Sequence, residues 1–369
     1  ALFTSLITFP WVIKPIWSPF VDVIKTKRWW VLTMQVLMCI TVLLLAILAP
    51  TGPLSIALIL FAITAFASAT HDIAADGYYM LALTEQQQSA FVGIRSTFYK
   101  IAGIFCQSVL LILVGELQRF VSVSASWTYA LLLVSAILAL IALWHAFAMI
   151  PVETDPVSLP SGEVWHSIIE TFVTFFQKPG IALALAFFLL YRLPEAMLLK
   201  LCNPFFLADK ADGGLALTVE QIGLYYGGVG VALMLLGGIL GGILISRFGL
   251  KKMMIPMALA LTLPCVVYVY FAVLQPTNIV PIAICIGIEQ FGYGLGYTAC
   301  MMYMIRFAEG QYQTAHFSIC TAFMFIGIMF PGMPAGYLQE WLGYTAFFVL
   351  VMIMCIPSLI VTYLVYRKL

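Results

Sequence analysis

The sequence predicts an all-α integral membrane protein, and three observations support this. The chain of 369 residues is 63% hydrophobic and only 9% charged, whereas soluble domains carry roughly 25% charged residues. Its apolar residues are gathered in runs that reach the ~20 residues a membrane helix needs. The runs lack the alternation of a membrane β-strand. Because lipid offers no partners for backbone N–H and C=O groups, helices are the expected spanning elements.

Eleven apolar runs are long enough to span a membrane. They cover approximately residues 1–19, 29–49, 54–82, 91–116, 126–150, 179–203, 219–246, 252–274, 278–304, 314–337 and 344–366. Lysines and arginines follow the first, seventh and ninth runs and end the chain, so they fall on one side if the runs alternate. Because basic loops stay in the cytoplasm, we expect a cytoplasmic C-terminus and Ala1 on the opposite side.

An internal repeat relates the two halves of the chain. Tyr79 matches Tyr303 and Glu85 matches Glu309, at a constant offset of 224 residues (303 − 79). The offset pairs runs one to five with runs seven to eleven and leaves the sixth run without a partner. Since that partner would precede residue 1, we expect one further N-terminal helix and twelve helices in the intact protein.

The repeat divides the chain into three parts. We expect an N-terminal bundle of five helices at 1–150, a cytoplasmic linker at 151–178 and a C-terminal bundle of six helices at 179–369. The linker has apolar residues at helical spacing: Trp165, Ile168, Ile169, Phe172 and Phe176. This pattern is typical of an amphipathic helix at the membrane interface. The alternative is that the segment extends the sixth run, but Pro179-Gly180 favours a break.

Groups that carry enzyme chemistry are missing from the sequence. Eight cysteines are scattered through apolar runs without a C-x-x-C pair, so we interpret them as reduced packing residues. We find no metal-ligand cluster, no nucleophile–base pair and no phosphate-binding glycine loop. We therefore expect no catalytic residue, no metal and no cofactor. The formal net charge of +1 gives no basic field for nucleic acid.

A compact basic motif follows the seventh run. Its residues are Gly242, Ser246, Arg247, Gly249, Lys251 and Lys252. A small residue such as Gly242 allows two helices to approach closely. After the first run, the equivalent position holds Asp22, whose carboxylate can bind a neighbouring helix end in one conformation. The plainer interpretation is that both loops only set the topology.

The motif resembles the G-x-x-x-D-R-x-G-R-[RK] signature of the major facilitator superfamily, with Ser246 in place of the acid. Several other stretches resemble the muropeptide permease (AmpG-like) family. They are Pro10–Asp22, Ala69–Tyr78, Tyr191–Ala196, Leu217–Gly223 and Gln313–Ser318. The resemblance covers nearly the whole chain except the family's first helix, and it departs from the family at His71 and Tyr79. It implies an inner-membrane symporter that carries cell-wall-derived sugar peptides with protons.

Ionisable groups within spans are costly, which makes them functional candidates. Asp72 and Asp76 share one face of the third run, and Arg95 and Lys100 enter the fourth run from the same end. We predict that Asp72 or Asp76 lies within salt-bridge distance of Arg95 or Lys100. Such a pair is either a structural lock or a gate or proton relay, and a lock that opens in one state is also a gate.

The sixth and ninth runs hold charges near mid-depth. Arg192 and Glu195 lie three residues apart, and Pro194 weakens the helix between them, which frees backbone groups to meet a ligand. Glu289 lies ~16 Å along its run at 1.5 Å per residue. We interpret Arg192 as the binder of an anionic substrate group and one of the two acids as the proton carrier; a structural polar contact is the alternative for Glu289. Lys14 either meets an anionic group or extends to the interface.

We therefore predict a secondary transporter that works by alternating access. Its partners would be a small-molecule solute, protons and the lipid bilayer, and it would act as a monomer in a bacterial inner membrane. Two alternatives come from other classes: a membrane-embedded enzyme, and a non-transporting sensor or scaffold with the same fold.

Overall fold

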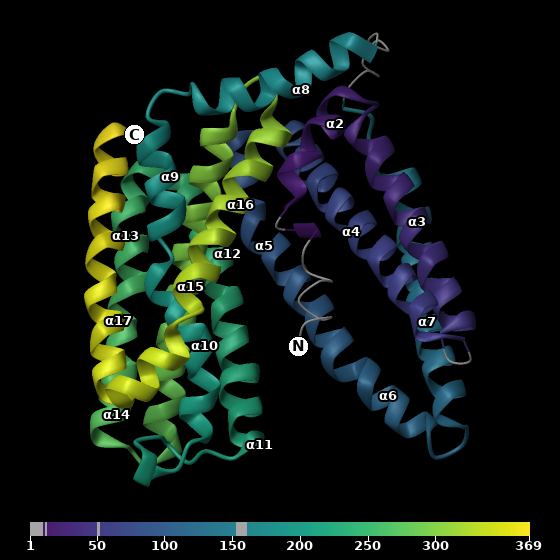
Figure 1. Cartoon of the computed structure of the whole chain (residues 1–369). Coiled ribbons are helices and arrows are strands. Elements are labelled where there is room, and N and C mark those ends of the chain that lie inside the picture. Colours follow the sequence, from purple (N-terminus) through teal and green to yellow (C-terminus); the bar gives the residue numbers. More distant parts are fainter. Residues whose placement is uncertain (1–9, 12, 50–51, 153–160) are drawn as a thin grey trace. The chain divides into compact units, whose positions relative to one another are not determined.

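The computed structural model describes residues 10–11, 13–49, 52–152 and 161–369, and the regular elements of this part of the chain are all helical (Figure 1). In chain order they are η1 (Lys14–Ile16), α2 (Ser18–Val23), α3 (Lys27–Leu48), α4 (Leu54–Ala82), α5 (Glu85–Ile104), η2 (Phe105–Val109), α6 (Leu110–Leu117), α7 (Val123–Ala148), α8 (Ser161–Phe176), α9 (Ile181–Leu190), α10 (Leu193–Leu207), η3 (Lys210–Asp212), α11 (Val219–Ile222), η4 (Gly223–Gly230), α12 (Val231–Phe248), α13 (Leu250–Thr262), η5 (Leu263–Cys265), α14 (Val266–Leu274), α15 (Ile279–Ala308), α16 (Gln313–Gly332) and α17 (Ala335–Lys368).

Within the described residues, nine helical stretches are long and apolar enough to cross a membrane. They are α3, α4, α7, α9 with α10, α11 through α12, α13 through α14, α15, α16 and α17. The predicted all-α membrane class is thereby confirmed. Of the two other expected spans, 1–19 falls largely outside the described residues. The other, 91–116, is formed by α5, η2 and α6, and this stretch is not among the nine.

The chain folds into two compact units. Unit 1 comprises Ala1–Ala82, Tyr99–Gln177 and Ala308–Ala322, and unit 2 comprises Leu83–Phe98, Lys178–Phe307 and Phe323–Leu369. Helices α5 and α16 therefore contribute residues to both units. The bundles expected at 1–150 and 179–369 follow the sequence repeat rather than these boundaries, and that division stays a prediction.

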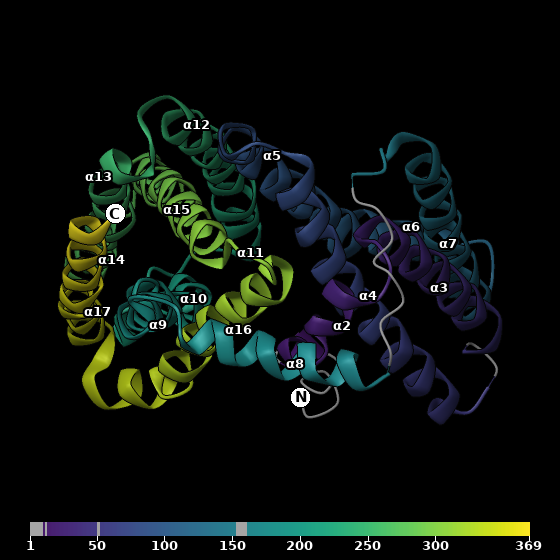
Figure 2. The ribbon, with the colours of Figure 1, turned by 90° about the horizontal axis from the view of Figure 1, so that it is seen from above.

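Unit 1 is built on α3, which packs against α4 and α7 (Figures 1 and 2). Hydroxyl groups join the helices inside the membrane: Thr64 of α4 donates to Thr41 of α3 at 2.8 Å. At the C-terminal end of α7, the Arg28 guanidinium donates to the carbonyl oxygen of Ala146 at 2.7 Å, and the Tyr78 hydroxyl donates to that of Ile150 at 2.9 Å. The first bond caps a carbonyl in the last turn of α7, and the second holds the chain two residues beyond that helix, so the three helices are fixed at one end.

Helix α8 is separate from the sixth span. It ends before the left-handed Gly180 (φ 78°), after which α9 begins. Within unit 1 it packs against α2 and runs at a steep angle to α3 and α4 (Figure 1). Ile168 and Phe175 are buried, whereas Trp165 and Ile169 are exposed. An exposed apolar row agrees with an interfacial position, which stays a prediction.

Unit 2 is organised around α17, which packs against α9, α10, α13 and α14 (Figure 2). Its core is rich in aromatic rings that meet edge to face, among them Phe205 of α10 and Phe348 of α17, whose centroids are 4.8 Å apart. On the other side, α12 and α15 approach so closely that a Cβ added at Gly294 would overlap the carbonyl oxygen of Met234. A Cβ at Gly237 would likewise overlap that of Phe291. Small residues thus set this helix–helix distance.

The close approach predicts a position-specific cost of one methyl group. Gly294→Ala should lower the free energy of unfolding by ~1–3 kcal/mol, because the added carbon has no space and the helices must separate. Gly336→Ala in α17 is the matched control, since a Cβ there meets nothing within 4 Å. It should leave stability unchanged or raise it slightly, as alanine is the better helix former. Thermal unfolding in detergent measures both, and equal effects would contradict the packing argument.

Candidate functional site

The sixth span is interrupted at Tyr191 and Arg192, between α9 and α10. Pro194 lies in the first turn of α10, where its missing N–H costs nothing. The sequence suggested that backbone groups freed here would be open to a ligand. The carbonyl oxygen of Tyr191, however, already accepts a 2.6 Å hydrogen bond from Ser358 of α17. The Tyr191 hydroxyl donates to the carbonyl oxygen of Gly296 at 2.9 Å. The break is therefore held between α15 and α17.

A buried ion pair lies at this break. Arg192 donates through Nε to Glu195 Oε2 at 2.7 Å and through Nη2 to Oε1 at 2.5 Å. Both residues are buried, at 6% and 5% exposure. Two parallel charge-assisted bonds are the strongest contact that these side chains can form. In a low-dielectric site the pair is costly to separate unless another charge replaces the lost partner.

Two tyrosine rings cover the guanidinium. Arg192 Nη2 also donates to the Tyr293 hydroxyl at 3.0 Å, and its central carbon lies 5.0 Å from the Tyr297 ring centroid. The two rings stack with centroids 6.1 Å apart, and both are partly exposed. Nη1 contacts Met324 Sδ at 3.5 Å. An arriving anion must therefore compete with Glu195 for Arg192. The sequence alone did not single out these tyrosines, although they follow Glu289 at i+4 and i+8 on one face of α15.

Glu289 is held by neutral donors. Its Oε2 accepts from Gln290 Nε2 at 2.8 Å and, more weakly, from the Tyr268 hydroxyl of α14 at 3.4 Å. The residue is buried. An acid with uncharged partners in such a place gains from taking up a proton. Both interpretations of Glu289, a proton carrier and a structural contact, fit this geometry, and the choice stays a prediction.

In unit 1, Lys14 forms an ion pair with Asp72, with Nζ 2.8 Å from Oδ2. The Lys14 side chain is 2% exposed, so of its two interpretations the structure contains the anionic contact. Asp76 is also buried. Lys14 and Asp72 are 58 residues apart, and only their similar distance from the inner ends of their spans could have suggested the pair. Arg95 belongs to unit 2, and pairing of either acid with Arg95 stays a prediction.

The expected partner Lys100 has a side chain outside the described part of the structure. Pairing of Asp72 or Asp76 with Lys100 therefore also stays a prediction.

Asp22, near the C-terminal end of α2, contacts the start of α16. Its Oδ2 accepts from the backbone N–H of Ala315 at 2.8 Å, and its Oδ1 is 3.2 Å from Lys27 Nζ. A carboxylate at a helix N-terminus is stabilised by the unpaired N–H groups and the helix dipole. This is the type of contact that the sequence predicts for Asp22. Its opening during transport stays a prediction.

The linker helix α8 is tied to the same end of α16. The Tyr312 hydroxyl donates to Glu170 Oε2 at 2.9 Å, and His316 Nε2 lies 3.0 Å from the carbonyl oxygen of Thr171. Burial and the hydrogen bond to Glu170 raise the pKa of Tyr312, so it stays a neutral donor at physiological pH. Within unit 1, the start of α16 is thus bound by both α2 and α8.

The two glycines of the basic motif in unit 2 lie at positions where a larger side chain would clash or strain the backbone. A Cβ at Gly242 of α12 would overlap the carbonyl oxygen of Ser89 at the start of α5. Gly249 joins α12 to α13 with φ 81°, which glycine adopts readily. Arg247, Lys251 and Lys252 are exposed, and Ser246 is half-buried. The motif therefore combines a close helix contact with a tight basic turn.

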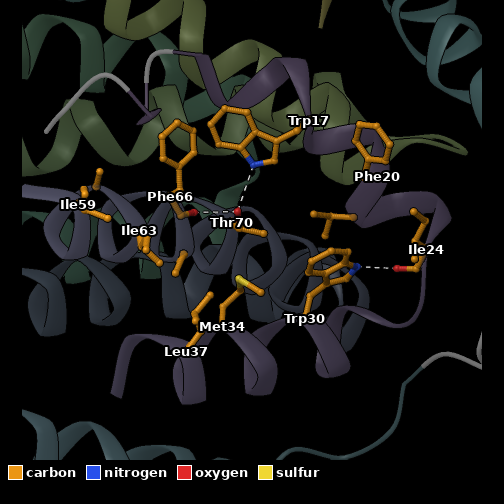
Figure 3. A pocket seen from close by; sticks show the side chains of 13 residues that line it. Trp17, Phe20, Ile24, Trp30, Met34, Leu37, Ile59, Ile63, Phe66 and Thr70 are labelled. Carbon is orange, nitrogen blue, oxygen red and sulfur yellow. Dashed lines mark hydrogen bonds between the residues drawn. The ribbon is translucent and has the colours of Figure 1, made fainter. Parts of the chain in front are cut away.

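An apolar groove of about 570 Å³ lies in unit 1 between α2, α3 and α4 (Figure 3). The hydrogen bonds among its lining residues run from the Trp17 indole N–H to the Thr70 hydroxyl, from that hydroxyl to the carbonyl oxygen of Phe66, and from the Trp30 indole N–H to the carbonyl oxygen of Ile24 (Figure 3). The lining residues are Trp17, Phe20, Val21, Ile24, Trp30, Met34, Leu37, Ile59, Ala62, Ile63, Phe66, Ala67 and Thr70. None of these carries a charge, so the groove offers neither a proton acceptor nor a counter-ion.

The family model of the Major Facilitator Superfamily matches residues 1–201 and 196–368. The chain belongs to the major facilitator superfamily. It is 22% identical over 363 residues to the anhydromuropeptide permease of Escherichia coli (strain K12), covering 97% of this chain and 71% of that protein. It is 24% identical over 357 residues to the putative transporter AmpG 3 of Rickettsia typhi, covering 93% and 82%.

The fold is also that of a solved superfamily structure. The Escherichia coli fucose:proton symporter FucP matches with a TM-score of 0.75 and 16% identity, covering 98% of this chain and 90% of that chain. The predicted two-bundle transporter fold and the resemblance to the muropeptide permeases are thereby confirmed. The chain is a multi-span transporter of this superfamily, and its family acts on small-molecule solutes in a lipid bilayer.

Because Lys14 and Asp72 differ in exposure, mutating one or the other should lower the free energy of unfolding by different amounts. Asp72→Leu removes the carboxylate and leaves an ammonium group that water does not reach, whereas Lys14→Met leaves a carboxylate that is 38% exposed. Removing one partner of a fully buried pair costs ~3–5 kcal/mol. We expect Asp72→Leu to approach that range and Lys14→Met to stay well below it. Unfolding of both mutants and of the double mutant measures the effect, and the double mutant should recover most of the loss. The opposite order, or strict additivity, would contradict the pairing.

Proposed function

We propose that this chain is a proton-coupled symporter for a cell-wall-derived muropeptide, or a related solute with an anionic group, in the inner membrane of a bacterium. The observation that carries the proposal is the buried Arg192–Glu195 pair, covered by two tyrosine rings at a break in a spanning helix. The names of the relatives support the solute class. We propose further that the chain acts as a monomer with a cytoplasmic C-terminus.

The pair offers a physical route to coupling. Both oxygens of Glu195 accept hydrogen bonds from Arg192, so a solute carboxylate can form two hydrogen bonds with Arg192 only when those to Glu195 break. A proton on Glu195 removes its charge and frees the guanidinium for the solute. By thermodynamic reciprocity, the bound anion then raises the proton affinity of Glu195. Neither ligand binds well alone, which is the requirement for symport.

Glu289 supplies a second acid on the same face of α15 as Tyr293. Burial at this depth favours the protonated form, and the hydrogen bonds that Gln290 and Tyr268 donate to the carboxylate oppose it only in part because neither donor is charged. One of the two acids carries the proton, and the other responds to the change of charge beside it. Loading thus changes the relative free energies of the outward-open and inward-open states.

Gating falls to contacts near the helix ends. We propose that the contact of Asp22 with α16 and the ion pair of Lys14 with Asp72 form in one state and break in the other. We propose the same for the contacts of the basic loop motif, Gly242, Ser246, Arg247, Gly249, Lys251 and Lys252. Asp76, Arg95 and Lys100 belong to the same proposed gate. A contact that exists in only one state biases the equilibrium by its own free energy.

Replacing Glu289 separates coupling from binding. Glu289→Gln mimics the protonated acid, so it should abolish accumulation of solute driven by a pH gradient and leave exchange down a solute gradient largely intact. Proteoliposomes loaded with the purified chain measure both modes with a radiolabelled anhydromuropeptide.

Two controls sharpen this test. Glu340→Gln removes an exposed acid of α17 and should change neither mode. Asp22→Asn weakens the contact with α16 and should slow both modes together. Normal accumulation by Glu289→Gln would move the proton to another acid. No uptake by the unmodified chain would favour the sensor or scaffold instead.

The double variant Arg192→Gln with Glu195→Gln tests the anion site. Removing both charges leaves no buried ion behind, so the fold should survive. The unmodified chain should prefer a muropeptide with free carboxylates over its amidated form by at least ~10-fold, about 1.4 kcal/mol. The double variant should lose this preference. Uptake competition between the two forms measures it, and an unchanged preference would place the anion site elsewhere.

A further inference from the structure

Two histidines and one glutamine meet inside unit 1, and the transport mechanism proposed above uses none of the three. The amide nitrogen of Gln35, on α3, lies 2.7 Å from His145 Nδ1 on α7 and 3.2 Å from His71 Nε2 on α4. Gln35 is only 4% exposed. Of the three helices that carry these side chains, α3 packs against both α4 and α7.

In the arrangement observed, one hydrogen-bond acceptor of this group has no donor. An amide nitrogen carries two protons, so it can donate one to each ring only if both facing ring nitrogens are unprotonated. Gln35 Oε1 is then left buried without a hydrogen-bond partner. A buried acceptor without a partner costs ~1–3 kcal/mol. The observed orientation therefore belongs to two neutral histidines and carries a penalty.

Reversing the amide changes which protons the site accepts. With Oε1 between the rings, Gln35 accepts from His145 Nδ1–H and from His71 Nε2–H. A neutral imidazole can donate in this way, and so can an imidazolium, which donates through both ring nitrogens. The reversed orientation thus allows one of the two rings to become an imidazolium, and the observed orientation does not. Proton occupancy and the orientation of Gln35 are therefore linked.

We propose that His71, Gln35 and His145 form a proton-binding site in unit 1, in which uptake of one proton accompanies reversal of the Gln35 amide. The ligand is a proton alone, and no bond other than N–H forms or breaks. Protonation of the other ring as well is disfavoured, because two imidazolium rings would then share one acceptor at close range. The site is independent of the solute carried at Arg192.

Charged groups on the neighbouring elements set the balance at this site. On α4, Asp72 follows His71 directly and Asp76 lies further along, and both favour a cation. Lys14 before α2 already binds Asp72, and Arg28 of α3 binds the carbonyl oxygen of Ala146, next to His145. Helix α7 carries no charged residue besides His145 when it is protonated. Two acids and two bases offset one another, so the first proton meets no strong repulsion.

The position of His71 gives the site a consequence for the rest of unit 1. A cation on His71 stands beside Asp72 in the chain, and it competes with Lys14 for that carboxylate. Since Asp72 is partly exposed, it can move between the two. Proton uptake therefore weakens the Lys14–Asp72 pair, which makes that contact sensitive to pH.

Trp144 supplies an optical readout, because its ring centroid lies 5.1 Å from that of His145. An imidazolium quenches indole fluorescence more strongly than a neutral imidazole does. The full chain, reconstituted in lipid nanodiscs, is titrated between about pH 5 and pH 8, the range in which histidine changes charge. The difference between the unmodified chain and Trp144→Phe isolates the signal of this tryptophan. We expect a one-proton step that His145→Gln abolishes.

Gln35→Leu tests the bridge. Leucine accepts no proton from either ring, so the midpoint should fall by about one pH unit or more, while Cys39→Ala, one turn along the same helix, should leave it unchanged. If the unmodified chain and Trp144→Phe differ by a constant across the range, there is no proton site. An unchanged midpoint in Gln35→Leu would remove the bridging role. Trp144→Phe keeps all three residues, so the test holds even if His145→Gln fails to fold.

Discussion

The Arg192–Glu195 ion pair is the contact on which the arrangement of unit 2 depends, because a charged group at that depth in a membrane must be neutralised by the protein itself. The helix break at Arg192 also removes backbone hydrogen bonds from a spanning helix. Ser358 on α17 replaces one of them, and the Tyr191 hydroxyl reaches the carbonyl oxygen of Gly296 on α15. Thus α15 and α17 are both fixed to the break.

The glycines of α15 follow from the same constraint. To bring two tyrosines and Glu289 toward α10, α15 must also pack closely against the helices behind it. A Cβ at Gly292 would overlap the carbonyl oxygen of Ala260 on α13, and one at Gly294 would overlap that of Met234 on α12. Each glycine allows the backbone of α15 to approach by the width of a methyl group. The polar face of α15 and its glycine face are therefore two parts of one design for binding charge inside a membrane.

The sequence predicted the parts of this protein that depend on local chemistry. Run length and composition gave the helices, and Pro194 with Pro179-Gly180 marked the breaks on either side of α9. It could not predict contacts between residues distant in the chain. Lys14 with Asp72, and Gln35 with His71 and His145, join different spans, and a single glutamine in an apolar run gives no sign of its partner. Helix rotation decides such contacts, and one sequence does not contain it.

The two compact units show a regularity that the repeat explains. The segment Leu83–Phe98, which belongs to unit 2, and Ala308–Ala322, which belongs to unit 1, occupy equivalent places in the two halves, about 224 residues apart. In unit 1 the end of α2 meets the start of α16, and in unit 2 the end of α12 meets the start of α5. The same helix contact therefore occurs twice.

The two copies differ in charge, and this difference has a physical consequence. Asp22 brings a carboxylate to the N-terminus of α16, whereas Ser246, 224 residues later, has only a hydroxyl group. A charge-assisted bond to a helix N-terminus is about twice as strong as a neutral one, and it also depends on the ionic surroundings. The unit 1 contact should thus be the harder of the two to open. A transporter with unequal contacts has an intrinsic preference for one state, and solute and proton binding must overcome that preference to drive the cycle.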